Sequence, residues 1–271
     1  MPTRAGRFSD MEGCAVRTMD LFLFAGQSNM AGRGVPCERY PERAPAVTPG
    51  AGWEFRAVSD PTRLYPLEEP FGKNENRPEG IHEEIKTGSM VSAFANAYYA
   101  ETHVPVVGVS ASKGGSSMVE WQPGGPYLTD ALERLKMARS WLISREYSVR
   151  HVFVLWCQGE TDGDLGTPKE AYQQGFDRML RAMRNAGAER LFLVRVGHYN
   201  GPEDPFRYVP MMRWQEEIAR TRPDVTMVSR LFSTMRERGL MKDAFHYYQA
   251  GYNEVGWEAG VNTAAWVLQN T

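Results

Sequence analysis

Short apolar runs that alternate with helical segments constrain the fold of this chain more than any other feature. The runs lie at residues 21–24, 104–109, 152–156, 191–196 and 225–228 and consist mainly of Val, Leu and Phe. Near-continuous apolar runs of this length are typical of strands that are covered on both faces. The segments with helical spacing are 89–100, 129–143, 167–187, 209–220 and 251–268. This alternation predicts a single three-layer α/β/α domain with a mainly parallel, five-stranded sheet.

The predicted domain covers residues 21–271. Residues 1–20 carry six charged side chains and lack the apolar region of a secretion signal, so we expect an N-terminal extension and a cytoplasmic protein. Residues 34–88 interrupt the alternation, because they are rich in Pro, Gly, Glu and Asn and contain only scattered apolar residues. We interpret this segment as an irregular loop excursion with room for a short hairpin.

Charge and composition exclude several classes of function. The 31 basic and 33 acidic residues give a net charge of −2, so no basic excess points to nucleic acid or to an anionic membrane. The apolar runs are far shorter than the ~18 residues of a membrane-spanning helix. The three cysteines are widely spaced and no His-Glu-x-x-His motif occurs, which argues against a zinc site.

Candidate functional residues follow the predicted strands directly. Ligands of open α/β sheets bind beyond the carboxyl ends of the strands, so these positions are expected to meet. Ser28 follows the first run, where a tight turn can expose its hydroxyl. Gly114 and Gly115 follow the second run and offer backbone N–H groups to an anion. Gln158 follows the third run and can present an amide donor.

An acid and a base lie close together near the end of the chain. Asp243 precedes His246 by three residues and can accept the Nδ1–H of the imidazole, which leaves Nε2 free to act as a base. With Ser28 as the nucleophile, these residues supply the parts of a serine hydrolase, and the donors after the second and third runs can hold its oxyanion.

The same motifs resemble a known family. Residues 26–30 (Gly-Gln-Ser-Asn-Met), 114–121, 156–162 and 243–246 are similar to those of carbohydrate esterase family 6. This family is the sialate O-acetylesterase and acetylxylan esterase branch of the SGNH hydrolases. The motifs occur in the expected order and span nearly the whole chain.

The resemblance implies a flavodoxin-like fold, no metal and no cofactor, and the removal of O-acetyl groups from sugars. It also implies that Ser28 is the nucleophile, His246 the base and Asp243 the partner of the base. Oxyanion donors are expected at Ser28, Gly114, Gly115 and Gln158, with supporting roles for Gln27, Asn29 and Glu160. We expect Glu160 to orient Gln158 and the nearby backbone, and the alternative is that it joins the His246 network.

Aromatic side chains are candidates for stacking on the sugar. Trp121, Trp53 and Tyr127 are the candidates; Trp121 has the better claim because it directly follows the glycine loop, whereas core or loop packing is the favoured interpretation of Trp53. The expected partner is therefore an acetylated carbohydrate. One rival is a glycosidase that pairs Glu160 with Asp162 or Asp243, which would require carboxyl groups about 5–5.5 Å apart if it retains configuration. Another rival is a carbohydrate-binding protein without catalysis.

Overall fold

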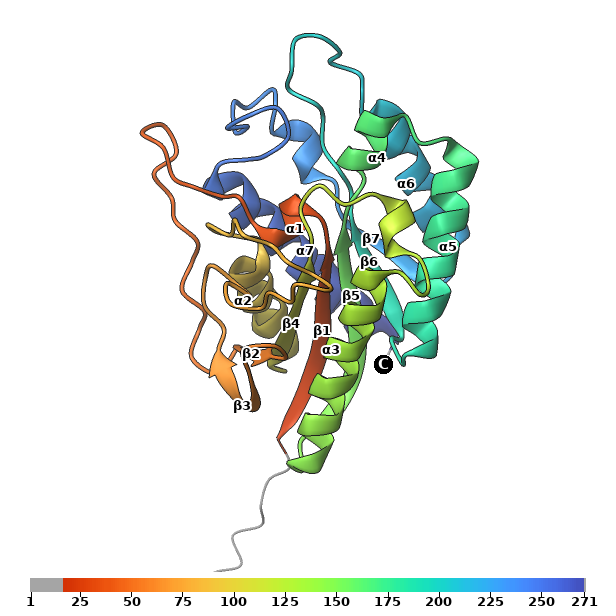
Figure 1. The fold of residues 1–271 in the computed structure, drawn as a ribbon. Helices are drawn as coiled ribbons and strands as arrows, with labels where there is room; N and C mark the ends of the chain where they lie inside the picture. Colours follow the sequence, from red (N-terminus) through yellow and green to blue (C-terminus); the bar gives the residue numbers. More distant parts are fainter. Residues whose placement is uncertain (1–16, 271) are drawn as a thin grey trace, which may run out of the picture.

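Seven strands form one sheet in residues 17–270, the part of the chain that this computed structural model describes (Figure 1). Their order across the sheet is β3-β2-β4-β1-β5-β6-β7. Only β3 runs antiparallel to its neighbour, and the other pairs are parallel. The strands are β1 (Thr18–Gly26), β2 (Gly52–Arg56), β3 (Asp60–Pro66), β4 (Val106–Ser112), β5 (Ser148–Cys157), β6 (Arg190–Val194) and β7 (Val225–Ser229).

The five predicted strands are all present, but the sheet has seven strands rather than five. Strands β2 and β3 form a hairpin inside the excursion 34–88 and extend the sheet at one edge. β3 has no fully buried residue, so it lacks the continuous apolar run by which the other strands are recognised. The predicted N-terminal extension is also too long, since β1 begins at Thr18 and residues 18–20 belong to the sheet. Residues 1–16 lie outside the described part.

Helices cover both faces of the sheet, which confirms the three-layer prediction. The five long helices match the predicted segments: α2 (Val91–Thr102), α3 (Pro126–Ser144), α5 (Lys169–Asn185), α6 (Val209–Thr221) and α7 (Gln249–Asn270). Short helices follow three of the strands: α1 (Ser28–Ala31), α4 (Glu160–Leu165) and the 3-10 helix η2 (Leu231–Thr234). A further 3-10 helix, η1 (Met118–Trp121), lies in the segment between β4 and α3. Within residues 17–270, no helix combines the length and the apolar character needed to cross a bilayer.

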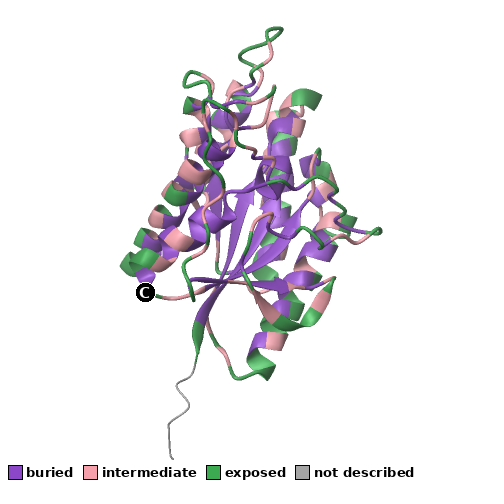
Figure 2. Cartoon of the chain, turned by 90° about the vertical axis from the view of Figure 1, so that its left-hand side faces the viewer, coloured by how far each residue is buried: buried purple, intermediate pink, exposed green. Residues whose placement is uncertain are grey.

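Alternate side chains of the central strand β1 face opposite layers. Leu21 and Leu23 pack toward α3 and α5, whereas Phe22 and Phe24 pack toward α2 and α7. The ring of Phe22 meets that of Phe94 on α2 edge to face, with the centroids 5.2 Å apart. Figure 2 shows that the middle of the sheet is buried, as strands covered on both faces must be, and β1 and β4 are buried along nearly their whole length.

The order of the strands determines where the site lies. β4 lies on one side of β1 and the next strand in the chain, β5, lies on the other. The strand order therefore reverses at β1, and open α/β sheets bind ligands in the crevice at such a switch point. Gly26 at the end of β1 lies level with Ser112 on β4 and Cys157 on β5. Three loops therefore start at one place. Gly26 has a φ of +137°, and a Cβ there would lie 2.0 Å from the Cys157 carbonyl oxygen, so only glycine fits this turn.

Candidate active site

The structure brings Ser28, His246 and Asp243 together above the carboxyl end of the sheet. The Ser28 hydroxyl lies 2.9 Å from Nε2 of His246, although 218 residues separate them. On the other side of the ring, Nδ1 lies 3.0 Å from Oδ2 of Asp243. Both distances are those of hydrogen bonds, so a proton can pass from the hydroxyl to the imidazole.

The loop that carries His246 is folded around Asp243. Oδ1 of Asp243 accepts the backbone N–H groups of Phe245 at 2.9 Å and of His246 at 2.7 Å, which leaves Oδ2 for the ring. Partial burial raises the pKa of Asp243, but the hydrogen bonds from the His246 ring and the two N–H groups outweigh it and lower that pKa below the usual 3.8. Asp243 therefore stays ionised and holds the hydrogen of the imidazole on Nδ1.

Asn29 ties the nucleophile helix to the histidine loop. Its Nδ2 donates to the carbonyl of Phe245 at 3.0 Å and to Oε1 of Glu160 at 2.5 Å, and the Tyr252 hydroxyl donates to its Oδ1 at 2.6 Å. The supporting role expected of Asn29 thus has a physical basis. It sets the distance between Ser28 and His246.

Glu160 lies at the start of α4 and is buried. Burial raises its pKa, and its Oε2 has no hydrogen-bond partner among residues 17–270. Its contact is with Asn29 rather than with Gln158, so the prediction that it orients Gln158 is wrong. Gln27, the other supporting residue, accepts the N–H of Gly159 at 3.0 Å and so fixes the backbone that leads into α4.

Two residues that line the cavity have backbone N–H groups without a hydrogen-bond partner in the described chain. Ser28 is the first residue of α1, so its N–H has no partner within the helix. The Gly115 N–H also has no hydrogen-bond partner in the described chain, and Gly115 has a φ of +69° that favours glycine. By contrast, the Gly114 N–H donates to the carboxylate of Glu83, so the prediction of Gly114 as an oxyanion donor is wrong.

Gln158 is fully buried and does not reach the cavity. Its amide nitrogen donates to the carbonyl of Ser116 at 3.1 Å and to Oδ2 of Asp162 at 2.5 Å, which uses both hydrogens. The prediction that Gln158 donates to the oxyanion therefore does not hold in this geometry. Because Asp162 also accepts the Met118 N–H, its carboxylate has a structural task.

Ser28 and His246 line a cavity of about 210 Å³. Two much larger hollows, of about 650 and 630 Å³, lie elsewhere on the surface and include no triad residue. The cavity is lined by Gln27, Ser28, Arg33, Gly115, Glu160, Thr161, Asp164, Phe245 and His246. The sequence analysis missed Arg33, Thr161, Asp164 and Phe245. Only Asp164 had a signal, since it is the third acid of the motif that contains Glu160 and Asp162.

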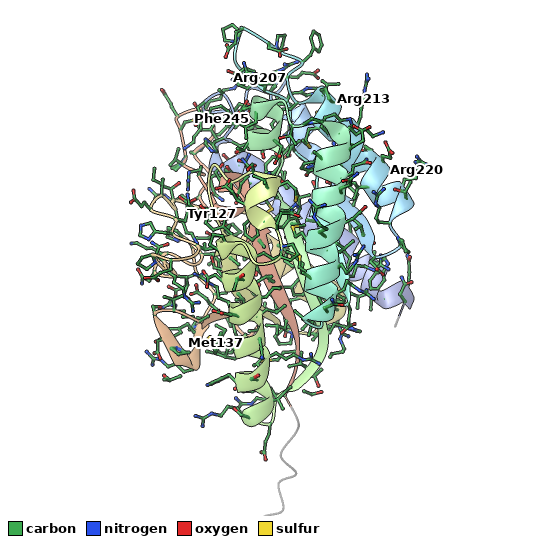
Figure 3. The ribbon with its side chains drawn as sticks, turned by 45° about the vertical axis from the view of Figure 1, so that its right-hand side comes forward. Tyr127, Met137, Arg207, Arg213, Arg220 and Phe245 are labelled. Atoms are coloured by element: carbon green, nitrogen blue, oxygen red, sulfur yellow. The ribbon has the colours of Figure 1, made fainter. Side chains whose placement is uncertain are left out.

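Asp164 lies on α4 and is contacted by the residues that precede α6. The Tyr208 hydroxyl donates to it at 2.9 Å and the Arg207 guanidinium at 3.2 Å. Figure 3 shows Arg207 at the same end of the molecule as Phe245, which lines the cavity from the histidine loop. The cavity is thus lined by residues from both halves of the chain.

Residues 18–261 match the family model described as carbohydrate esterase, sialic acid-specific acetylesterase. The chain belongs to this family. Membership confirms the resemblance found in the sequence, whereas the numbered family 6 stays a prediction.

Three individual proteins are similar to this chain. A probable carbohydrate esterase of Arabidopsis thaliana is 28% identical over 178 residues, and the match covers 61% of this chain and 63% of that relative's length. An X-ray structure of a protein from Arabidopsis thaliana superimposes with a TM-score of 0.65 at 19% identity, over 94% of this chain and 99% of that one. A carbohydrate acetylesterase from Xanthomonas citri gives 0.59 at 17% identity, over 93% and 57%. At such identities the structures show a shared fold.

Trp121 does not form a stacking surface in this esterase. Its side chain is completely buried, its Nε1 donates to the Ser116 hydroxyl at 2.8 Å, and its ring packs edge to face on Trp156 at 5.0 Å. The predicted contact of Trp121 with substrate is therefore wrong. Tyr127 is only half-buried and lines a neighbouring cavity of about 330 Å³ with Lys113 (Figure 3). Trp53 lines one of the larger hollows and is packed partly against the core.

Proposed function

We propose that the chain hydrolyses O-acetyl esters of carbohydrates by a two-step acyl transfer through Ser28. The observation that carries this proposal is the unbroken line of hydrogen bonds from Ser28 through His246 to Asp243 at the wall of a cavity. Family membership supports the choice of acetylated carbohydrates as substrates.

In the first step, Oγ of Ser28 attacks the acetyl carbonyl carbon while Nε2 of His246 takes the hydroxyl proton. The carbonyl oxygen becomes an oxyanion that the N–H groups of Ser28 and Gly115 stabilise, and such donors are worth most in a water-poor site. The imidazolium gains from the ionised Asp243 beside it. Collapse breaks the ester bond, and the imidazolium gives its proton to the oxygen of the departing sugar hydroxyl.

In the second step, a water molecule attacks the acetyl group on Ser28 and His246 accepts a proton from it. The second tetrahedral intermediate uses the same two N–H donors and then releases acetate and the free Ser28 hydroxyl. The reaction consumes one ester and one water and needs no further reactant.

The size of the cavity favours a short acyl group. Pockets that enclose a drug-sized ligand usually measure about 300–1,000 Å³, whereas this one measures about 210 Å³. We therefore expect the acetyl group to enter the cavity while the sugar stays at its mouth, where the carboxylate of Asp164 can accept hydrogen bonds from hydroxyl groups.

The direct test is acetate release from O-acetylated sialic acid, acetylated xylo-oligosaccharides and the matching butyryl esters, run beside Ser28→Ala. We expect acetyl esters to be preferred, and the variant to lose about 10⁵–10⁶ in kcat because the triad acts as a unit. A variant that keeps more than about a tenth of the activity would overturn the assignment of Ser28. Sugar binding without acetate release from any substrate would instead identify a non-catalytic binding protein.

A further inference from the structure

We propose that Glu83 is a positioning residue that holds the Gly115 donor in place for the oxyanion. The inference rests on the proposed function and adds to it a residue from the excursion 34–88. Glu83 does not line the triad cavity and touches no reacting atom, so it acts through the groups that it binds.

One carboxylate joins the two loops that carry the oxyanion donors. Oε1 of Glu83 accepts a hydrogen bond from Nη2 of Arg33 at 2.8 Å, and Oε2 accepts the N–H of Gly114. Arg33 is the second residue after the helix that begins with Ser28, and Gly114 directly precedes Gly115. The distance between the Ser28 and Gly115 donors therefore depends on Glu83.

The glycine loop is closely packed against this ion pair. A Cβ on Gly114 would lie 2.5 Å from Oε2 of Glu83 and 2.7 Å from Nη2 of Arg33, so the backbone rests directly on the two side chains. On the other side of the loop, the Ser116 hydroxyl donates to the carbonyl of Lys113 at 2.7 Å. Both contacts hold the peptide group between Lys113 and Gly114. The next peptide group supplies the Gly115 N–H, and its Gly114 carbonyl accepts a hydrogen bond from Nζ of Lys113 at 2.9 Å.

Arg33 also cancels the charge of Glu83. The Glu83 side chain is 5% exposed and that of Arg33 is 11% exposed, so water screens the pair little. Without the guanidinium, a buried carboxylate would lie beside the place where a negative oxygen develops. Removing Arg33 is therefore expected to harm the reaction more than removing Glu83.

Contacts of the excursion itself hold Glu83. Its N–H donates to Oδ1 of Asn76 at 2.8 Å, and the nearby Ile81 N–H donates to Oδ2 of Asp130 on α3 at 2.9 Å. The excursion is therefore anchored to a long helix before it reaches the glycine loop. Through Glu83, the excursion 34–88 thus has a role in catalysis.

The test compares Glu83→Ala and Glu83→Gln with a matched control, Glu75→Ala. Glu75 is a buried carboxylate of the same excursion that accepts hydrogen bonds from Val58 and Ser59, and none of the hydrogen bonds of its carboxylate in the described chain goes to the glycine loop. With p-nitrophenyl acetate we expect Glu83→Ala to lower kcat about 10–100-fold, part of the 10²–10³ lost with a whole oxyanion donor, and to change KM less than about threefold. The rate of Ser28 phosphonylation by a fluorophosphonate should fall in parallel, while Glu75→Ala stays within about twofold of wild type.

Glu83→Gln keeps the shape of the side chain and decides the matter if Glu83→Ala does not fold. A Gln has one acceptor oxygen, so it loses either the Arg33 or the Gly114 bond, and we expect kcat to fall at least about fivefold. Arg33→Ala should lose more than Glu83→Ala, and the double variant should recover to the level of Glu83→Ala, because the unpaired carboxylate is gone.

The inference is overturned if folded Glu83 variants stay within about twofold of wild type or lose no more than Glu75→Ala. In that case wild-type turnover and its loss in Ser28→Ala would leave the proposed function intact. If the wild-type protein neither releases acetate nor labels at Ser28, the proposed function and this inference fail together.

Discussion

Replacing Asp243 by Asn tests whether Asp243 or Glu160 is the acid that orients His246. The single oxygen of the introduced amide can keep the bonds from the Phe245 and His246 N–H groups, so the loop should retain its shape. The amide nitrogen then faces Nδ1 of the ring at the present distance of 3.0 Å, and two donors cannot share that contact. The ring must therefore carry its hydrogen on Nε2, where it can no longer accept the proton of Ser28.

The expected loss follows from this change of tautomer. The same replacement in a serine protease costs about 10⁴ in kcat, which corresponds to about 5 kcal/mol of transition-state stabilisation. We expect a loss of about 10³–10⁴ in kcat for acetate release, with KM nearly unchanged, because Asp243 does not contact the substrate in the proposed mechanism.

Glu160→Gln is the matched control. The Gln oxygen can still accept from Nδ2 of Asn29, so the contact that holds the histidine loop survives and kcat should fall by less than about tenfold. Steady-state kinetics on one acetylated sugar, with both variants checked by circular dichroism, measures the two effects together. A loss below about 100-fold for Asp243→Asn combined with a loss above about 10³ for Glu160→Gln would refute the reasoning and make Glu160 the orienting acid.

Three further predictions concern residues whose predicted roles the structure changed. Gln158→Ala should lower the free energy of unfolding by about 1–3 kcal/mol, because the Asp162 carboxylate loses a buried partner, and should lower kcat less than about tenfold. Denaturant unfolding and steady-state kinetics measure both effects. A 100-fold loss of kcat in Gln158→Ala with an unchanged free energy of unfolding would support Gln158 as an oxyanion donor after all. Trp121→Ala should lower the free energy of unfolding by about 3–5 kcal/mol, because it leaves a cavity in the core. A raised KM for sugars at unchanged stability would contradict the buried, structural role of Trp121. Burial raises the pKa of Glu160 in the folded protein above the usual 4.5. As the pH rises, the unfolded chain therefore loses this proton before the folded protein does, and the free energy of unfolding falls between the two pKa values. The melting temperature of Glu160→Gln relative to wild type should therefore increase between about pH 4 and pH 7, and a constant difference would exclude the effect.

The strands and the triad could be predicted because each leaves a local signal. A strand covered on both faces needs an apolar run such as residues 21–24. Asp243 and His246 lie three residues apart, so their contact is nearly independent of the rest of the fold. The parallel sheet then brings Ser28 to them, because loops after neighbouring strands meet at one edge.

The errors arose where distant packing decides the outcome. The sequence does not show whether the amide of Gln158 faces a cavity or a carboxylate. In the structure the amide donates a hydrogen bond to Asp162, four residues later. Trp121 follows the glycine loop, but the chain turns it inward onto Trp156. Glu83 lies in a segment without periodicity, and only the folded excursion brings it to Gly114.

The most direct measurement of the central claim is the site at which a fluorophosphonate attaches to the protein. Mass spectrometry of the digested wild-type protein should find one phosphonyl group on Ser28 and no label on Ser28→Ala. An unlabelled but active wild-type protein, or a label on a residue other than Ser28, would contradict the account.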